Sequence, residues 1–245
     1  MSLMGPSPLL RARGFIFDLD GTLTANMPLH AEAFARFTER HGLPPFTLEM
    51  RARLDGKRNS DIFPILFERA LSPDEIRRLS GEKEALYREI SGGRLAPLPG
   101  LTRLLETLQT HGIPAAVATS SPADNVPHTL RELGLESLLP RVVRSDEVPR
   151  GKPHPDVFLA AARRIDVPPE ACLAFEDAPA GIVAARAAGM GCVADTTTFP
   201  AAEFQAHGAA PDAAVADYEE FLAGPGAWLL SPVDSGSCGA SGPAL

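Results

Sequence analysis

The chain has 245 residues and a formal net charge of −8 at pH 7. This acidic balance argues against a nucleic-acid-binding protein, which usually presents a basic face, and no apolar run approaches the roughly 18 residues of a membrane-spanning helix. An apolar content of 44% beside 22% charged residues is ordinary for a globular protein. The three cysteines form no CxxC pair, and the apolar surroundings of Cys172 and Cys192 favour small core residues in a reducing cytoplasm.

The first predicted element is a short buried strand over residues 14–18. Its apolar residues lead into Asp18 and Asp20, and Gly21 follows, as is typical of a strand that stops at a turn. Two carboxylates at that exit cannot both be buried unpaired, because desolvating charge is expensive. A hard divalent ion with oxygen ligands is the simplest partner, and an aspartate pair that caps the turn is the alternative.

The block from residue 25 to residue 95 is predicted to be all helical. Ser72-Pro73-Asp74-Glu75 has the form of a capping box with proline at the first helical position, so a helix should begin there and run to residue 90. The other expected helices cover residues 28–41, 47–54 and 59–70.

From residue 97 onward, helices and strands are predicted to alternate. We expect helices over 101–111, 124–133, 156–165 and 181–188, and strands over 114–119, 142–143, 172–176, 191–193 and 213–215. Such alternation predicts an α/β fold with a Rossmann-like parallel sheet covered on both faces by helices. Ligands bind at the carboxyl ends of such strands, and Asp18, Thr119 and Asp177 all lie at or just past predicted strand ends.

The sequence therefore predicts a discontinuous α/β core, residues 12–24 and 96–222, with a helical cap inserted over residues 25–95. The two connections lie near Ala25-Asn26 and near residues 95–99. Residues 1–11 form an N-terminal extension in which we expect no signal peptide. Residues 224–245 are rich in glycine, serine and proline, so we expect an unfolded tail.

Four stretches, in the required order, resemble the haloacid dehalogenase-like (HAD) superfamily over residues 14–222. Within it the chain resembles the β-phosphoglucomutase-like branch, which contains phosphatases and phosphomutases. The stretches are Asp18-Leu-Asp20-Gly-Thr-Leu-Thr, Val117-Ala-Thr119-Ser120-Ser121, Gly151-Lys152-Pro-His-Pro and Ala174-Phe175-Glu176-Asp177-Ala-Pro-Ala-Gly181.

The resemblance implies roles for the residues in these motifs. Asp18 would be the nucleophile and a metal ligand. Asp20 would be the general acid and base, with its backbone carbonyl on the metal. Thr119 and Ser120 would bind the phosphate, and Lys152 would neutralise both Asp18 and the transferring group.

Asp177, with Glu176 as a direct or water-mediated second ligand, would complete the metal site. Mg²⁺ suits this oxygen-only set of ligands. Capping of the following helix is the competing role for Asp177.

Substrate-binding residues are expected in the cap as well as in the core. His30 lies where the mutase has a histidine at the cap hinge, and residues 54–62 resemble the mutase's substrate-binding loop. The loop arginine falls one position early, so that Asn59 occupies its expected place. A solvated cap surface is the alternative for the two basic residues. The expected substrate-binding set is His30, Lys57, Arg58, Asn59, Ser120 and Ser121.

We therefore expect a Mg²⁺-dependent phosphohydrolase of small phosphate monoesters, such as sugar phosphates, that acts through an aspartyl-phosphate. A β-phosphoglucomutase-type sugar phosphomutase is the alternative, although Ser121-Pro122-Ala123 stands where the mutase has Ser-Lys-Asn. Lys57 lies near, but not at, the position that the Schiff-base lysine of a phosphonoacetaldehyde hydrolase needs. A non-catalytic HAD-fold binding protein is a further alternative. Such a protein would lack Asp18, Asp20, Lys152 or Asp177, and all four are present here. The expected partner is a small phosphorylated metabolite, with no nucleic acid, membrane or protein partner implied.

Overall fold

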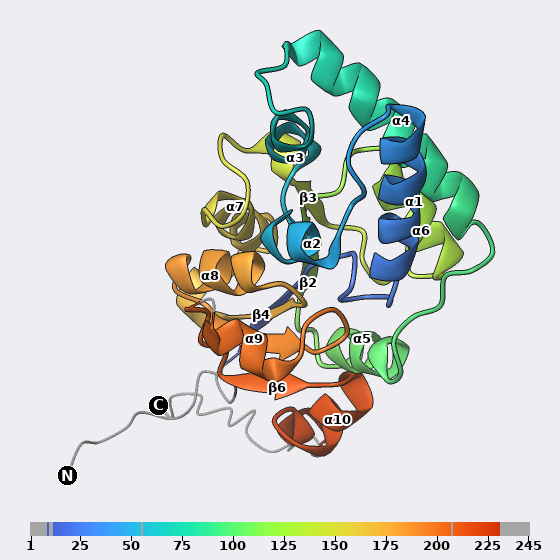
Figure 1. Cartoon of the computed structure of the whole chain (residues 1–245). Helices are drawn as coiled ribbons and strands as arrows, with labels where there is room; N and C mark the ends of the chain where they lie inside the picture. The colour runs from blue at the N-terminus through green and yellow to red at the C-terminus, as the bar shows by residue number, and fades with distance from the viewer. Residues whose placement is uncertain (1–8, 10–11, 55, 207, 231–245) are drawn as a thin grey trace, which may run out of the picture.

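One six-stranded parallel sheet organises the molecule. The structure, a computed structural model, describes residue 9 and residues 12–54, 56–206 and 208–230 (Figure 1). The strand order is β3-β2-β1-β4-β5-β6, and every neighbouring pair is parallel, which confirms the predicted α/β fold. The strands are β1 (Gly14–Phe17), β2 (Ala115–Thr119), β3 (Val142–Arg144), β4 (Cys172–Glu176), β5 (Gly191–Asp195) and β6 (Ala213–Val215).

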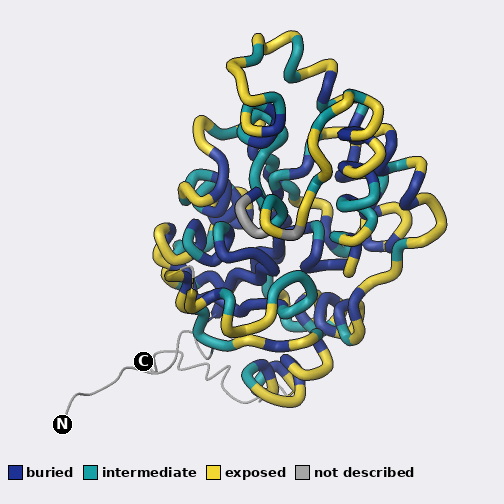
Figure 2. The backbone as a smooth tube through the Cα atoms, in the orientation of Figure 1, coloured by how far each residue is buried: buried dark blue, intermediate teal, exposed yellow. Residues whose placement is uncertain are grey.

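The two faces of the sheet carry separate hydrophobic clusters, because successive side chains of a strand point to opposite faces. Phe17 and Phe175 pack on one face with helices α5 (Leu101–Thr110), α6 (Asn125–Glu132) and α10 (Tyr218–Ala223). Ile16 and Ala174 pack on the other face with α7 (Asp156–Arg164), α8 (Pro179–Ala187) and α9 (Ala201–Ala206). Burial on both faces explains the near-continuous apolar runs of the central strands, which are dark in Figure 2.

Four helices between β1 and α5 enclose a third hydrophobic cluster of their own. They are α1 (Met27–Arg40), α2 (Leu48–Leu54), α3 (Asn59–Leu66) and α4 (Pro73–Ser91), and among the described residues from 25 to 95 there is no strand. Phe37, Phe63 and Tyr87 belong to this cluster. Figure 1 shows α1, α3 and α4 together, away from the β6 edge of the sheet.

The capping box of α4 is confirmed. The backbone N–H of Glu75 donates to Ser72 Oγ over 3.2 Å, and the backbone N–H of Ser72 donates to Glu75 Oε2 over 2.9 Å. Helix α3 ends at Leu66 rather than at residue 70, because Glu68 adopts a left-handed φ of 50° that no α-helix accommodates. Helix α8 begins two residues earlier than predicted, at Pro179, since proline is favoured at the first helical position.

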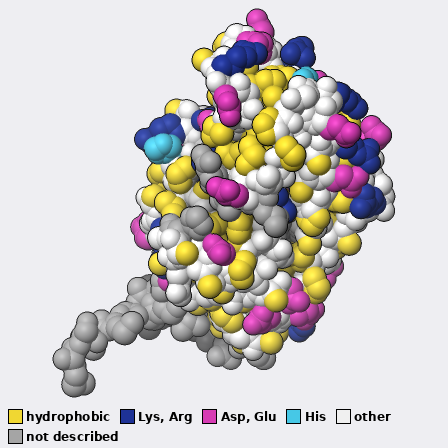
Figure 3. All heavy atoms as spheres, in the orientation of Figure 1, with side chains coloured by type: hydrophobic (Ala, Val, Ile, Leu, Met, Phe, Trp, Pro, Cys, Tyr) yellow, Lys and Arg dark blue, Asp and Glu magenta, His cyan; other side chains and the backbone are white. Residues whose placement is uncertain are grey.

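The surface in view mixes the two signs of charge. Figure 3 shows Lys and Arg side chains interspersed with Asp and Glu on this face. Among the described residues, no helix combines the length and the hydropathy that crossing a bilayer requires.

The prediction of an unfolded tail from residue 224 is wrong for residues 224–230. A 3-10 helix forms over Ala227–Leu230, and the Gly226 N–H donates to the carbonyl of Phe221 over 2.8 Å. Leu229 is buried in the cluster that contains Phe221. The glycine and proline content of this segment favoured disorder, but the segment also contains a short apolar run that the core can bury. Residues 231–245 lie outside the described residues, as do residues 1–8 and 10–11 of the N-terminal extension.

Two adjacent leucines test this packing. Leu229 is 1% exposed and Leu230 is 42% exposed. We expect Leu229→Ala to lower the free energy of unfolding by about 2–4 kcal/mol, because it leaves a cavity in the core. Leu230→Ala should change it by less than about 0.5 kcal/mol. Urea unfolding measures both, and equal values for the two variants would contradict the packing.

Candidate active site

The predicted motif residues meet at the carboxyl edge of the sheet. Asp18 directly follows β1, Thr119 ends β2, and Glu176 ends β4 with Asp177 immediately after it. Strand β1 pairs with β2 on one side and with β4 on the other. The parallel pairing therefore brings residues from three distant parts of the sequence to one place.

Three carboxylates and one ammonium group form the centre of the site. Asp18, Glu176 and Asp177 are buried, and an oxygen of each lies within 4.8 Å of an oxygen of the others. Lys152, whose side chain is 1% exposed, donates hydrogen bonds to both Asp18 and Glu176. The second oxygen of Glu176 accepts from the backbone N–H of Ala178 over 3.0 Å. One lysine therefore faces three carboxylates.

The pKa values of the cluster are shifted mainly by burial and then by the neighbouring charges. Burial raises the pKa of Asp18 to about 8, although the neighbouring Lys152 acts to lower it. Burial, and then the charge of Glu176, also raise the pKa of Asp177 well above its ordinary value, while a hydrogen bond from Thr198 opposes them. For Lys152, burial would lower the pKa, but the charges of Asp18 and Glu176 outweigh it.

The cluster fits a hard divalent cation. Its donors are carboxylate oxygens only, which suit Mg²⁺, and burying several carboxylates beside a single cation is costly unless more positive charge is present. Asp18, Asp177 and Glu176 are the residues that would hold the ion. Asp20, also predicted as a ligand, directs its side chain elsewhere, so only its backbone carbonyl is available for that role.

Two glycines make room for these carboxylates. Gly21 has a φ of 82°, and a side chain there would collide with Asp177 Oδ2. A side chain at Gly181 would collide with Glu176 Oε1. Both glycines occur in the motifs read from the sequence, but only the structure shows that each faces a carboxylate.

Asp20 lies in a different environment from Asp18. Its Oδ1 accepts from Asn26 Nδ2 over 2.6 Å and lies 3.3 Å from Nε2 of His30, while its Oδ2 accepts from Ser121 Oγ. Burial alone would raise the pKa of Asp20, but His30, Ser121 and Asn26 hold it below its ordinary value. The two aspartates of the motif therefore shift in opposite directions, with Asp20 as the ionised partner.

His30 is buried between the helices and the core, so it is not a partly exposed helix residue. Its ring stacks on Tyr87 with the centroids 3.7 Å apart, and its Nδ1 lies 2.9 Å from Nζ of Lys83. Lys83 also donates to Glu84 over 3.0 Å. Neither Lys83 nor Glu84 was expected at the site from the sequence. The available signal was a charged pair on the face of α4 that also carries Leu79 and Tyr87.

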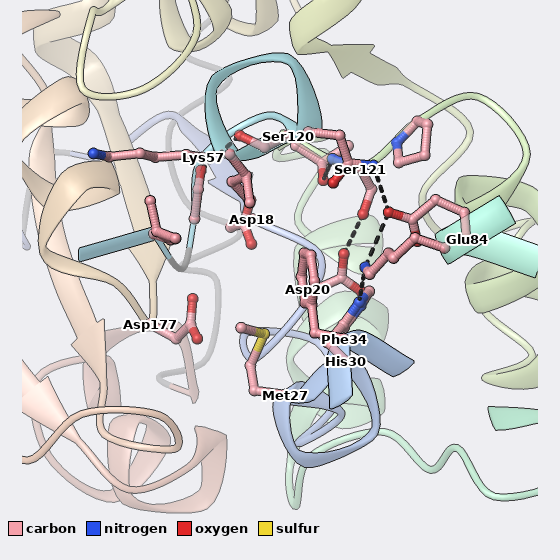
Figure 4. A pocket seen from close by; sticks show the side chains of 17 residues that line it. Asp18, Asp20, Met27, His30, Phe34, Lys57, Glu84, Ser120, Ser121 and Asp177 are labelled. Carbon is pink, nitrogen blue, oxygen red and sulfur yellow. Dashed lines mark hydrogen bonds and ion pairs between the residues drawn. The ribbon is translucent and has the colours of Figure 1, made fainter. Parts of the chain in front are cut away.

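A cavity of about 70 Å³ separates the sheet edge from the helices. Figure 4 shows Asp18 and Asp177 pointing into a common space, with Asp20 turned toward Ser121 and His30. The lining includes residues of the core motifs and residues of the helical segment: Asp18, Asp20, Thr119, Ser120, Ser121, Asp177, His30, Phe34, Lys57, Asn59, Lys83 and Glu84.

The expected substrate-binding residues are not all brought together. Lys57 lines the cavity, but Figure 4 shows its side chain extending away from Asp18. Asn59 donates to Glu84 Oε1 over 2.7 Å. Arg58 does not line this cavity. Its Nε lies 3.3 Å from Asp61, and its guanidinium donates to the carbonyl of Ser145 over 3.4 Å.

The core residues expected to bind phosphate lie at the end of β2 and on the loop after it. Ser121 donates its backbone N–H to Thr119 Oγ1 over 2.9 Å. Ser120 Oγ donates to the carbonyl of Gly56 over 2.8 Å and so links this loop to the helical segment. Both serines and Thr119 line the cavity beside Asp18.

The chain is similar in sequence to several known proteins. The model of the haloacid dehalogenase-like hydrolase family matches residues 12–189. A "phosphorylated carbohydrates phosphatase" of Thermotoga maritima is 35% identical over 179 residues, which are 71% of this chain and 81% of the relative. The β-phosphoglucomutase of Bacillus subtilis is 36% identical over 186 residues, 73% of this chain and 80% of the relative.

A solved structure is similar over most of the chain. The crystal structure of a hydrolase from Pseudomonas syringae matches with a TM-score of 0.76 and 28% sequence identity. The match covers 86% of this chain and 96% of that one.

The shifted pKa of Asp18 predicts how metal binding depends on pH. Without metal, the folded state keeps a proton on Asp18 up to about pH 8, whereas the ordinary pKa is 3.8. The stability that this proton provides is complete below about pH 4 and is lost as the pH rises through about 8. Because Mg²⁺ binds the ionised form, we expect the rise in Tm on adding Mg²⁺ to be larger at pH 8 than at pH 6. Equal rises would contradict the assignment, and Asp177→Asn should abolish both.

Gly21→Ala tests the space beside Asp177. The added methyl group should displace this carboxylate and weaken Mg²⁺ binding about 10- to 100-fold, measured by titration calorimetry. Gly42→Ala is the matched control, since Gly42 also has a positive φ of 61° but has no atom within 4 Å of an added Cβ. A loss of affinity in both variants would show that backbone strain, rather than the collision, is responsible.

Proposed function

Because the chain belongs to the haloacid dehalogenase-like hydrolases, we propose that it is a Mg²⁺-dependent phosphatase of sugar phosphates and related phosphate monoesters. The observation that carries this proposal is the buried cluster in which Lys152 contacts Asp18 and Glu176, next to Asp177. The names of the relatives, a phosphatase of phosphorylated carbohydrates and a sugar phosphomutase, support the same class of substrate.

Asp18 is the nucleophile of the proposed reaction. One of its oxygens attacks the phosphorus atom, and the ester oxygen leaves, so that an aspartyl-phosphate forms. The hydrogen bond from Lys152 fixes the Asp18 carboxylate and offsets its charge as an anionic phosphate approaches. Thr119 Oγ1, at the end of β2, and the backbone N–H of Ser120, on the loop that follows, bind the phosphoryl oxygens.

Mg²⁺, held by Asp18, Asp177 and Glu176, would supply positive charge for the phosphoryl oxygens. Lys152 contacts only two of the three carboxylates, and the ion would supply the charge that Asp177 lacks. The identity of the metal rests on the oxygen-only donor set and on the family.

Asp20 moves the protons. Its hydrogen bonds from Asn26 and Ser121 favour the ionised form, which suits the second step, where Asp20 takes a proton from the water that attacks the aspartyl-phosphate. In the first step an anionic phosphate beside Asp20 raises its pKa, because like charge disfavours ionisation. Asp20 then carries the proton that the leaving oxygen receives.

The helical segment 25–95 acts as a cap in this proposal. A cavity of about 70 Å³ is well below the roughly 300 Å³ or more of typical ligand pockets, so a phosphate ester enters only when the cap moves. The cap has a hydrophobic cluster of its own and can move as a unit. Closure then keeps water from the first step, and opening admits it for the second.

A sugar phosphomutase is the second candidate, supported by the similarity to the Bacillus subtilis enzyme. A mutase must hold a bisphosphate intermediate, and this chain has Pro122 and Ala123 beside the cavity rather than a lysine and an asparagine. The phosphatase therefore agrees better with the residues present.

We place the enzyme in the cytoplasm, where small phosphorylated metabolites occur. Cys172 and Cys192 are both buried with free thiols, which agrees with a reducing compartment. A small phosphorylated metabolite is the only partner that the site suggests.

The proposal is tested by the release of inorganic phosphate from a panel of sugar phosphates with and without Mg²⁺. We expect Mg²⁺-dependent release, and a fall in kcat of at least about 1,000-fold in Asp18→Asn, since the nucleophile is removed. Asp74→Asn, an exposed residue of α4, is the control and should keep the wild-type rate. A wild-type rate in Asp18→Asn would refute the mechanism. Isomerised sugar phosphate without free phosphate would identify a mutase.

A further inference from the structure

The loop after β5 begins with three consecutive threonines, residues 196–198, and the proposed mechanism uses none of them. Strand β5 is the neighbour of β4 in the sheet, with Ala194 paired to Glu176. Because the two strands are parallel, the loop leaves the sheet beside Asp177, which follows β4 directly. This placement brings a segment outside the four sequence motifs next to a residue of the carboxylate cluster.

Contacts on both sides of its centre hold this loop in place. The backbone N–H and the hydroxyl of Thr196 both donate to the carbonyl of Val215 in β6, over 2.8 Å and 3.1 Å. The hydroxyl of Thr197 donates to the carbonyl of Gly21, in the turn of the first motif. Phe199 packs on the hydrophobic cluster beneath α7, α8 and α9. The segment between Thr197 and Phe199 is therefore held at both ends.

Thr198 occupies that segment, and its hydroxyl donates to Asp177 Oδ2. The space around the two side chains is small. A Cβ added at Gly21 would collide with Asp177 Oδ2 and would lie 2.9 Å from Thr198 Oγ1. Since a β-branched side chain has few χ1 rotamers, the direction of this hydroxyl is well defined.

Asp177 has less support from the rest of the cluster than the other two carboxylates. Lys152 donates to Asp18 and to Glu176, and the backbone N–H of Ala178 donates to Glu176 as well. Among the described residues, no group other than Thr198 donates a hydrogen bond to the carboxylate of Asp177. The orientation of a metal ligand depends on such outer partners.

Thr198 acts on Asp177 from outside the catalytic cavity. The described residues that line the cavity include Asp177 but not Thr198. The hydroxyl therefore reaches the carboxylate without bordering the space that the phosphate enters, and any effect of Thr198 on the reaction passes through Asp177.

We propose that Thr198 is a positioning residue of the metal site, and that its hydroxyl holds the Asp177 carboxylate in the orientation that binds Mg²⁺. This inference rests on the proposed Mg²⁺ site and adds to it a residue from the loop after β5. Without the hydroxyl, the Asp177 side chain has to be ordered when the ion binds, and that ordering lowers the affinity.

Mg²⁺ affinity, measured by titration calorimetry in the absence of substrate, tests this role. Thr198→Val removes the hydroxyl and keeps the shape of the side chain, so we expect Kd to rise about 10- to 100-fold. Thr198→Ser keeps a donor and should stay within about threefold of the wild type. Wild-type affinity in Thr198→Val, or an equal loss in Thr198→Ser, would overturn the proposal.

Thr196→Val is the matched control in the same loop. It removes the same chemical group, but the carbonyl of Val215 still accepts from the backbone N–H of Thr196, so Mg²⁺ affinity should not change. A loss as large as that of Thr198→Val would assign the effect to the packing of the loop and would overturn the proposal. The Tm without metal shows that each variant folds, and Thr198→Ala replaces Thr198→Val if that variant does not.

The dependence of phosphate release on Mg²⁺ separates positioning from catalysis. In Thr198→Val we expect the Mg²⁺ concentration for half-maximal rate to rise with Kd, while kcat at saturating Mg²⁺ stays close to that of the wild type, because the reacting groups are intact. Asp18→Asn should instead lose kcat at every Mg²⁺ concentration. A kcat in Thr198→Val that remains as low as in Asp18→Asn at saturating Mg²⁺ would contradict a positioning role.

The wild-type titration distinguishes this inference from the proposed function. If the wild type binds Mg²⁺ and releases phosphate while Thr198→Val behaves identically, the phosphatase stands and the role of Thr198 fails. If the folded wild type binds no Mg²⁺, the metal site and the role of Thr198 fail together.

Discussion

The ion pair between Lys152 and the carboxylates of Asp18 and Glu176 is the constraint on which the site depends. A buried ammonium group or a buried carboxylate alone would cost several kcal/mol to desolvate, so neither partner is tolerable without the other. Lys152 reaches both carboxylates because β1 and β4 are neighbours in the sheet. Gly21 and Gly181 keep the space around the acids free of side chains. Asp177 stays without a cation of its own, which is why the cluster suits a metal.

Polar contacts join the cap to the core. Asp20 lies 3.3 Å from His30, His30 contacts Lys83, and Glu84 accepts from Asn125 of α6 over 2.6 Å. Farther along, Ser91 Oγ lies 2.9 Å from His128 Nε2. Water can replace such hydrogen bonds when the two parts separate, whereas exposing an apolar interface would be costly.

The site residues that could be identified from the sequence belong to local motifs, whereas the others reach the site through tertiary packing. Asp18, Thr119 and Asp177 follow apolar runs directly, so their place at strand ends could be predicted from periodicity alone. Lys83, Glu84 and Thr198 belong to no local motif, and they reach the site only through the packing of α4 on α1 and the path of the chain after β5. Arg58 shows the opposite case, since its position in the loop favoured substrate contact but its side chain lies outside the catalytic cavity.

The sequence by itself determined the parallel α/β sheet, the inserted helices and the identity of the four motifs, because hydrophobic periodicity, caps and turn residues are local properties. Only the tertiary structure decided that the pKa values of the two carboxylates in the first motif shift in opposite directions. Burial raises the pKa of Asp18, and hydrogen bonds lower that of Asp20. It also decided that residues 224–230 fold, since Leu229 finds space beside Phe221. These properties depend on distances and solvent exposure in three dimensions, and the spacing of residues along the chain does not give either.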